Sequence, residues 1–400
     1  MSFPPANPLH VAMYLHDLTA GGAERVAVTL MRHFIACNVR VSLLLHQETG
    51  ALRHLLPTPV EVHVLNGRRA LSDLLPLAAF LRRADPDVLV TYLQHDNIVA
   101  LLAKRMSRAR TRVAIGLHNT LSWEAGPTRS LKFRALPMVY RALRPFLEGI
   151  VAVSEGVAED FAEVVRIPRE RISCIYDPVI DDEFEQRARE PVDHPWLTEA
   201  ARTATPVFVT AARLITQKDI PTLLRAFAKR RQLGPARLIV LGDGPERALL
   251  TSLAEELRLN GDVDFKGYVA NVLPYFREAS AFVMTSRYEG FGLVLVEAMG
   301  CGTPVISTEC PFGPAEILDN GRFGCLVPVG DVDGLTAAMT RDLRAVWPSS
   351  VLRQRASLYS AEASRDAYLK FFAQLCAPSI PETTAELPGV TNCERPAATS

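Results

Sequence analysis

SRYEGFGLVLVEAMGCGTPVI, residues 286–306, carries the strongest structural signal in the chain. The apolar run AFVMTS (281–286) that leads into it predicts a buried strand, and an apolar helix is expected to begin near Leu293. Gly290 and Gly292 on the intervening loop allow a ligand to approach the backbone closely. The free N–H groups at the start of the helix face this loop, so the segment predicts a phosphate site.

Two carboxylates flank this predicted phosphate site. Glu289 stands on the loop, and Glu297 follows about one turn into the helix. Carboxylates accept hydrogen bonds from hydroxyl groups, so one can meet the hydroxyls of a sugar and the other those of a ribose. Two solvated glutamates on a strand–turn–helix would show the same spacing. The glycine-rich loop and the GCGTPVI that follows favour a nucleotide-sugar site.

The strand–helix rhythm of this segment extends in both directions. Short apolar runs alternate with helical patterns such as 23–37 and 220–233, which is typical of parallel strands buried on both faces. The runs occupy residues 11–15, 41–45, 87–92, 112–117 and 149–154, and then 206–212, 237–242, 263–267, 281–286 and 304–308. The charged segment 180–205 holds no such run. We therefore predict an α/β protein with two Rossmann-like doubly wound domains, 1–180 and 203–360, followed by a helix over 361–376 and a disordered tail, 377–400.

Composition narrows the functional classes. The 400 residues contain 44 Lys plus Arg and 44 Asp plus Glu, so nucleic acid is disfavoured as a partner. The seven cysteines include no C-x-x-C pair, which favours free thiols in a reducing compartment over disulfides or a zinc site. Neither a secretory signal pattern nor an apolar run of about 20 residues is present. We expect a cytoplasmic protein.

Two cations follow the first strand of the second domain. The run PVFVTAAR ends at Arg213, and Lys218 comes five residues later. The carboxyl edge of an open α/β sheet is where ligands bind, and Arg and Lys there suit a diphosphate. Two surface cations on a loop are the alternative. Because such cations can neutralise a leaving diphosphate, we expect neither a metal nor another cofactor.

Other strand ends carry weaker signals. Gly21 and Gly22 lie on the loop that leads into the predicted helix 23–37, and their N–H groups can face a phosphate, although a tight turn would also explain them. The loop LGDGP places Gly242 and Gly244 after another strand, where a plain turn is nearly as good an interpretation. In the first domain, His118 ends the run RVAIGL. His95, Asp96 and Asn97, with Gln94, follow DVLVTY, and we predict that they contact the acceptor.

The chain resembles the retaining GT-B glycosyltransferases of family 4, over about residues 10–375. Glu289 to Glu297 matches the E-x7-E signature of that family, and AGGAERV, AARLITQKD, LGDGPER, GYV and GPAEIL match further motifs in the same order. The resemblance implies donor contacts from Gly21, Gly22, Arg213, Lys218, Gly242, Gly244, Val269, Gly290, Phe291, Gly292, Leu293 and Glu297. It further implies catalytic roles for Glu289, His118, Arg213 and Lys218. One departure is Asp177-Pro178, where the family commonly has Asn-Pro.

The resemblance also implies what the protein does. A hexosyl or N-acetylhexosaminyl group would move from a nucleotide sugar, most often a UDP-sugar, to a lipid-linked or polysaccharide-precursor acceptor, with retention of configuration. The final helix would cross back to the first domain. A nucleotide-sugar epimerase on the same fold and a non-catalytic sugar-nucleotide-binding subunit are the competing hypotheses. The intact Glu289, Glu297, Arg213 and Lys218 weigh against the second.

One segment of the first domain is strongly basic. Residues 101–150 hold ten Lys and Arg against Glu124 and Glu148, a balance of +8. Apolar residues are interleaved among the cations; they are Leu131, Phe133, Leu136, Met138, Val139 and Tyr140. This mixture suits an anionic membrane surface, and a solvated basic helix face is the alternative. We predict reversible peripheral binding on the cytosolic side of a membrane.

Overall fold

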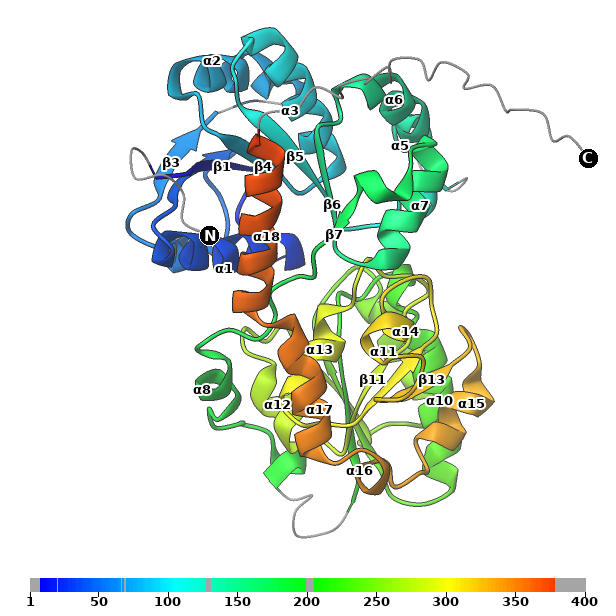
Figure 1. Cartoon of the computed structure of the whole chain (residues 1–400). Helices are drawn as coiled ribbons and strands as arrows, with labels where there is room; N and C mark the ends of the chain where they lie inside the picture. Colours follow the sequence, from blue (N-terminus) through cyan, green and yellow to red (C-terminus); the bar gives the residue numbers. More distant parts are fainter. Residues whose placement is uncertain are drawn as a thin grey trace, which may run out of the picture.

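A computed structural model describes residues 8–19, 21–65, 67, 70–126, 131–198 and 205–377. The predicted disordered tail lies outside the described residues, apart from Ala377. The described chain forms two parallel sheets, one in each half of the sequence. In Figure 1 the sheet of the first half lies above that of the second.

The first sheet has seven parallel strands in the order β3-β2-β1-β4-β5-β6-β7. Their bounds are β1 (His10–Leu15), β2 (Arg40–Leu45), β3 (Glu61–Val64), β4 (Val88–Thr91), β5 (Arg112–Leu117), β6 (Gly149–Ala152) and β7 (Ser173–Cys174). Every residue of β1 is buried. Val11 and Met13 join one apolar cluster while Ala12 and Tyr14 join another, so helices cover both faces of the sheet, as the continuous apolar runs predict.

The helices of this half connect the strands. They are α1 (Gly22–Ala36), α2 (Leu74–Ala84), α3 (Gln94–Ser107), α4 (Leu121–Glu124), α5 (Leu131–Arg134), α6 (Leu136–Leu143) and α7 (Glu155–Val165), with short 3-10 turns η1 (Arg53–Leu55), η2 (Ala70–Asp73), η3 (Arg144–Phe146) and η4 (Arg169–Arg171). Ser154 caps α7 by accepting a hydrogen bond from the Val157 N–H group.

The second sheet has six parallel strands in the order β10-β9-β8-β11-β12-β13. The strands are β8 (Val207–Ala211), β9 (Arg237–Leu241), β10 (Val263–Gly267), β11 (Ala281–Met284), β12 (Val305–Thr308) and β13 (Cys325–Val327). Helices and turns of the second half are α8 (Phe184–Ala188), η5 (Thr216–Lys218), α10 (Ile220–Gln232), α11 (Arg247–Glu256), α12 (Leu273–Glu278), α13 (Leu293–Gly300), α14 (Pro314–Ile317), α15 (Val332–Ala338), α16 (Leu343–Val346), α17 (Ser349–Ala356) and η6 (Ser357–Tyr359).

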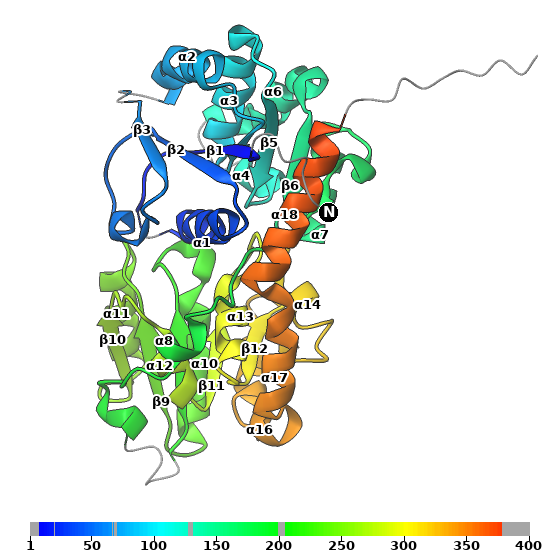
Figure 2. The same ribbon diagram turned by 60° about the vertical axis from the view of Figure 1, so that its left-hand side comes forward.

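The last helix, α18 (Ala361–Cys376), returns to the first sheet and packs along α1 (Figures 1 and 2). The rings of Tyr368 and Phe372 lie 6.0 Å and 5.7 Å from the ring of Phe34, measured between centroids. The chain therefore passes between the halves twice. The two passages touch, because the N–H groups of Val179 and Ile180 both donate to the carbonyl of Tyr359 at 3.0 and 3.1 Å.

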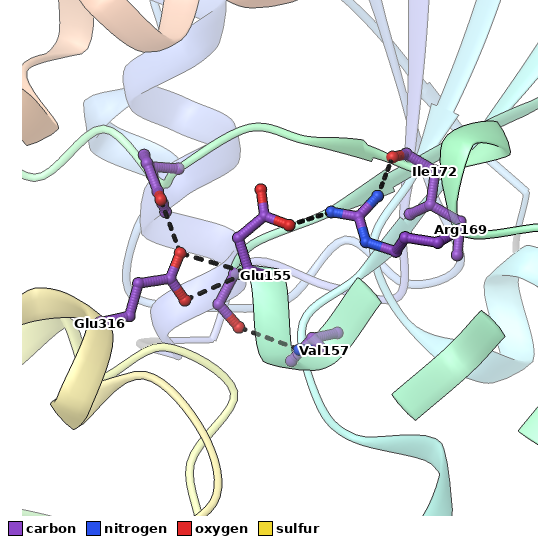
Figure 3. A network of polar contacts seen from close by, with 7 residues as sticks. Glu155, Val157, Arg169, Ile172 and Glu316 are labelled. Carbon is purple, nitrogen blue, oxygen red and sulfur yellow. Dashed lines mark hydrogen bonds and ion pairs between the residues drawn. The ribbon is translucent and has the colours of Figure 1, made fainter. Parts of the chain in front are cut away.

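Polar contacts also join the two halves beside α7. The Glu316 carboxylate on α14 accepts hydrogen bonds from the Glu155 N–H group at 3.1 Å and from the Tyr176 hydroxyl at 2.6 Å (Figure 3). Arg169 binds the Glu155 side chain and the carbonyl of Ile172 in the same view. These contacts hold the N-terminus of α7 against the second half of the chain.

The described helices contain no segment that meets the length and hydropathy needed to cross a bilayer. The longest of them, α18, has 16 residues and carries charged side chains along its length.

Candidate active site

The predicted site residues gather where the strand order of each sheet reverses. In the first sheet this point lies between β1 and β4, and in the second between β8 and β11. Loops that leave neighbouring strands there in opposite directions open a crevice, which is where open α/β sheets bind ligands. The glycine loop follows β1 and the His95 segment follows β4, whereas Lys218 follows β8 and Glu289 follows β11.

Lys218 and Glu289 form the centre of the second half's contribution. The Lys218 Nζ donates to Glu289 Oε1 at 2.5 Å, although the two residues are 71 positions apart. The Ser286 hydroxyl donates to the same oxygen at 2.6 Å. The Lys218 and Glu289 side chains are only 20% and 9% exposed, so both groups have lost most of their hydration. The pair is therefore held in one arrangement before any ligand binds.

The β8 and β9 loops lie against each other. Arg213 is exposed just beyond β8, and the N–H of Leu214 donates to the carbonyl of Asp243 at 3.0 Å. A side chain at Gly242 would overlap the Ala212 carbonyl at 2.0 Å, and one at Gly244 would overlap the Leu214 carbonyl at 2.4 Å. The glycines thus allow the close approach of two loops, which presents Arg213 at the sheet edge. This close packing explains both glycines of LGDGP as parts of a turn. A direct contact of the loop with the donor stays a prediction.

The N-termini of α13 and α1 face each other. Gly292 precedes α13 with a φ of +105°, a conformation that favours glycine. Gly21 precedes α1, and a side chain added at Gly22 would come within 3.0 Å of the Leu293 side chain. Phe291, on the loop before α13, is buried, and its ring centroid lies 5.7 Å from that of Tyr176. Two helix N-termini at one cleft offer free N–H groups and positive dipole ends to an anion.

Glu297 lies on α13, where burial raises the pKa of its carboxyl. The cations Arg25 and Arg187 oppose that shift, because a nearby positive charge favours the carboxylate. Arg25 also crosses the cleft, donating to the carbonyl of Ala270 at 3.3 Å beside the half-buried Val269. Arg25 was missed in the sequence, although it belongs to the AGGAERV motif.

His118 stands just beyond β5, and its side chain is largely buried, with 9% of its surface exposed. Its ring lies 5.2 Å from the ring of Tyr92, and burial lowers the pKa of His118 to about 4, so the imidazole is neutral at pH 7. Its Nε2 has no hydrogen-bond partner among the described residues. The carbonyl of His118 approaches Gly290 so closely that a side chain there would lie 1.9 Å from it. The structure thus brings His118 to the Glu289 loop.

Asp177, to which the sequence assigned no role, lies beside His118. Its Oδ1 is 3.8 Å from the Nδ1 of His118, and burial raises the pKa of Asp177 to about 8. A protonated aspartate has nearly the shape of asparagine and, like it, can donate a hydrogen bond. The Asp-Pro departure from the family's Asn-Pro is therefore a small one.

Three of the predicted acceptor residues fall in different environments. His95 is half exposed, whereas Asp96 is fully buried, and burial raises its pKa well above the usual range. Asn97 is buried and its amide is occupied, since it donates to Gly116 at 3.0 Å and accepts from Thr91 at 2.5 Å. This side chain therefore fastens strands of the sheet, and a contact of Asn97 with the acceptor stays a prediction.

A pocket of about 490 Å³ lies between the two halves beside this site. Trp123 lines it from the first half, and Asp219, Arg287 and Pro311 line it from the second. Trp123 also stacks on Tyr288 across the boundary, with centroids 4.8 Å apart. The site is thus shared between the two halves of the chain.

Solved structures of other proteins share this architecture. The lipopolysaccharide outer core galactosyltransferase WaaB in its apo form gives a TM-score of 0.72 at 18% identity, over 92% of this chain and 99% of that one. Anabaena Alr3699/HepE in complex with UDP-glucose gives 0.74 at 19% identity, over 92% and 100%. Two parallel-sheet α/β domains that share one interdomain site are the GT-B fold of glycosyltransferases, as the resemblance implied.

Curated proteins are similar along the sequence. The N-acetylgalactosamine-N,N'-diacetylbacillosaminyl-diphospho-undecaprenol 4-alpha-N-acetylgalactosaminyltransferase of Campylobacter jejuni is 25% identical over 374 residues, which is 89% of this chain and 98% of that protein. The lipopolysaccharide core biosynthesis glycosyltransferase LpsE of Rhizobium meliloti is 34% identical over 42% of this chain and 50% of its own length.

Two family models match consecutive parts of the chain. Glycosyltransferase Family 4 matches residues 20–183, and Glycosyl transferases group 1 matches residues 205–344. The chain therefore belongs to the group 1 and family 4 glycosyltransferases.

Proposed function

We propose that this glycosyltransferase moves a hexosyl or N-acetylhexosaminyl group from a UDP-sugar to a lipid-linked or polysaccharide-precursor acceptor, with retention of configuration. The observation that carries the proposal is the largely buried Lys218–Glu289 pair, whose carboxylate lies on the loop that leads into the N-terminus of α13. The printed names of the relatives support the substrate classes, since one is solved with UDP-glucose and another acts on a diphospho-undecaprenol.

In this mechanism the bond between the anomeric carbon and the diphosphate breaks while the acceptor oxygen bonds to the same face. Lys218, Arg213 and the N–H groups at the α13 N-terminus stabilise the negative charge that develops on the diphosphate, so the transfer needs no metal. An oxygen of the departing diphosphate takes the proton of the acceptor hydroxyl. Neutral His118 hydrogen-bonds a sugar oxygen through Nε2.

Glu289 orients the sugar in this scheme. Its Oε1 already accepts hydrogen bonds from Lys218 and Ser286, and this engagement fixes the carboxylate and reduces its power as a nucleophile. Its remaining oxygen is available to sugar hydroxyls. Glu297, one turn along α13, accepts hydrogen bonds from the ribose.

A donor screen tests the proposal. The purified chain is incubated with UDP- and GDP-sugars, with and without a lipid-linked saccharide acceptor, and free nucleoside diphosphate is measured. We expect release from a UDP-sugar that rises strongly when acceptor is present. Conversion of the nucleotide sugar to its epimer without acceptor would instead establish the epimerase alternative.

The two glutamates are predicted to act on different parts of the donor. Glu297→Ala should weaken the binding of UDP about tenfold, as expected for the loss of a hydrogen-bonded charged group, whereas Glu289→Ala should leave UDP binding nearly unchanged and lower kcat. Calorimetry with UDP measures the first effect and a transfer assay the second. The reverse order of UDP affinities would contradict the assignment.

We further propose that the protein works at the cytosolic face of a membrane, docked through α5, α6 and η3. Leu131, Met138 and Phe146 are 79%, 72% and 40% exposed, and the exposed Arg134 and Arg144 lie among them. Leu136 and Tyr140, which the sequence also placed on this face, are in the core instead. Together the exposed residues form an apolar and basic surface on the first domain, which we call the docking face.

Liposome flotation measures this docking. Each cation near an anionic surface contributes about 1 kcal/mol and is screened beyond roughly 8 Å at physiological salt, so binding to anionic vesicles should be lost as salt rises. Met138→Glu should reduce flotation severalfold. Leu249→Glu, at a 62% exposed leucine on α11, is the matched control and should leave it unchanged. Equal and negligible flotation with neutral and anionic vesicles at low salt would disprove docking.

A further inference from the structure

A group of histidines and acids occupies the point where the first sheet reverses its strand order. His16 follows β1, and His95 and Asp96 open α3 after β4. One ligand atom from each of these three side chains lies within 4.8 Å of the others. They come from two neighbouring strand ends, so the sheet topology brings them together.

Two side chains of this group, Asp96 and His16, have buried polar atoms without a hydrogen-bond partner among the described residues. His95 Nε2 lies 3.1 Å from Asp96 Oδ1, yet neither oxygen of the Asp96 carboxylate accepts a hydrogen bond from the described residues. His16 Nδ1 is also buried without such a partner. Two ligands of one ion, each about 2.0–2.1 Å from it, lie roughly 3–3.4 Å apart in tetrahedral or octahedral geometry. The His95–Asp96 spacing fits two ligands that share an ion.

Asp96 lies among other acidic groups. This side chain is fully buried, the carboxylates of Asp73, Glu24 and Asp17 act on it electrostatically, and the imidazole of His95 lies beside it. A buried carboxylate must be protonated or compensated by positive charge. Both oxygens of Asp96 lack a hydrogen-bond donor among the described residues and lie beside two imidazoles, an arrangement that suits a shared metal ion.

Neighbouring side chains hold the group in place. The ring of His16 stacks on the ring of His46, with centroids 4.5 Å apart. His46 Nδ1 lies 2.7 Å from Asp73 Oδ2, which also accepts a hydrogen bond from the Tyr14 hydroxyl at 2.6 Å. The His46 ring, fixed by Asp73, thus supports the ring of His16 by stacking, and outer contacts of this kind orient the ligands of a metal site.

We propose that His16, His95 and Asp96 bind a divalent transition-metal ion. Two imidazoles with one carboxylate suit Zn²⁺, Co²⁺ or Ni²⁺ better than Mg²⁺ or Ca²⁺, which prefer oxygen ligands. The half-exposed His95 gives the ion a route from solvent. The site is separate from the Lys218–Glu289 pair that serves the diphosphate, so the metal-independent transfer proposed above does not depend on it.

The experiment titrates the full-length chain, untagged and stripped of metal with a chelator, with Co²⁺ and Zn²⁺. Calorimetry gives the stoichiometry and affinity, and the visible absorption of Co²⁺ reports nitrogen ligation. We expect one equivalent bound, with affinity at least tenfold weaker in His16→Ala and in Asp96→Asn. The control His54→Ala removes an exposed histidine outside the group and should bind like the unmodified chain.

A second group of possible metal ligands serves as a control for metal binding elsewhere in the chain. His33, Asp182 and Glu362 also bring ligand atoms within 4.8 Å of one another. Glu362→Gln should leave the measured affinity unchanged. If Glu362→Gln abolishes binding while Asp96→Asn does not, or if the unmodified chain binds no more tightly than His16→Ala, the proposal is overturned.

Folding and donor binding are checked independently. Asp96→Asn removes a buried charge, so its metal-free form should unfold at a temperature no lower than that of the unmodified chain. UDP should bind Asp96→Asn normally, because Lys218, Arg213 and Glu297, which are proposed to hold the diphosphate and the ribose, lie on the other half. Loss of metal binding with UDP binding intact supports the site, and failure to bind UDP in the unmodified chain counts against the proposed function alone.

Discussion

Lys218→Ala is expected to lower kcat/KM for glycosyl transfer by about 100- to 1000-fold while the fold persists. Removing one preorganised group that stabilises developing charge typically has an effect of this size. In this chain the loss is compounded, because the ammonium also holds Glu289 at 2.5 Å in a site from which most water is excluded. The variant therefore loses a charge on the diphosphate and the fixed orientation of the carboxylate.

Steady-state kinetics and far-UV circular dichroism measure the two parts of this prediction. Lys229→Ala is the matched control, since Lys229 on the following helix forms an exposed ion pair with Asp333. That pair is worth little in water, so transfer should be normal. Near-normal turnover by Lys218→Ala would contradict the role proposed for this lysine in the active site.

Gly290→Ala is expected to reduce kcat/KM about 100-fold or more. The added methyl group would lie 1.9 Å from the carbonyl oxygen of His118, so the two halves of the chain must move apart to accommodate it. Displacing a reacting group by about 1 Å is enough for a loss of this size. Gly290 touches the first domain across the boundary, and each domain by itself should therefore remain folded.

Small-angle scattering and kinetics together test this explanation. The variant should be more extended than the unmodified chain, and UDP should still bind the second domain. Gly126→Ala serves as the control, because among the described residues a side chain there would contact only Trp123 of the same domain, at 3.1 Å. Full activity in Gly290→Ala would show that the contact between Gly290 and His118 is not needed for transfer.

The sequence predicted the strands of the two sheets wherever the apolar run was continuous. It missed β3, whose EVHV is half polar and partly exposed at the sheet edge, so no buried run marks it. It also missed β7 and β13, which have two and three residues, because such short edge strands are defined by their pairing partners. Edge strands depend on tertiary contacts that a local pattern does not contain.

The candidate site, like the sheets, was predicted only in part from the sequence. The ends of the predicted strands indicated that Lys218 and Glu289 lie at the carboxyl edge of the second sheet. Only the three-dimensional fold shows that these residues, 71 positions apart, form a hydrogen-bonded pair. His16 and His46 were overlooked even though each directly follows an apolar run, and the rule that singled out His95 would have found them. Asn97 met the same rule and proved to be internal, since its position on α3 turns it into the core.

The return of α18 has a consequence for how the protein is made. Tyr368 and Phe372 complete the apolar cluster that surrounds Phe34, a residue near the start of the chain. A nascent chain emerging from the ribosome therefore finishes the second domain, built within 205–359, while one face of the first domain is still uncovered. The domain whose synthesis begins first is the last to close, and until then the growing chain carries an apolar surface that must be kept from other molecules.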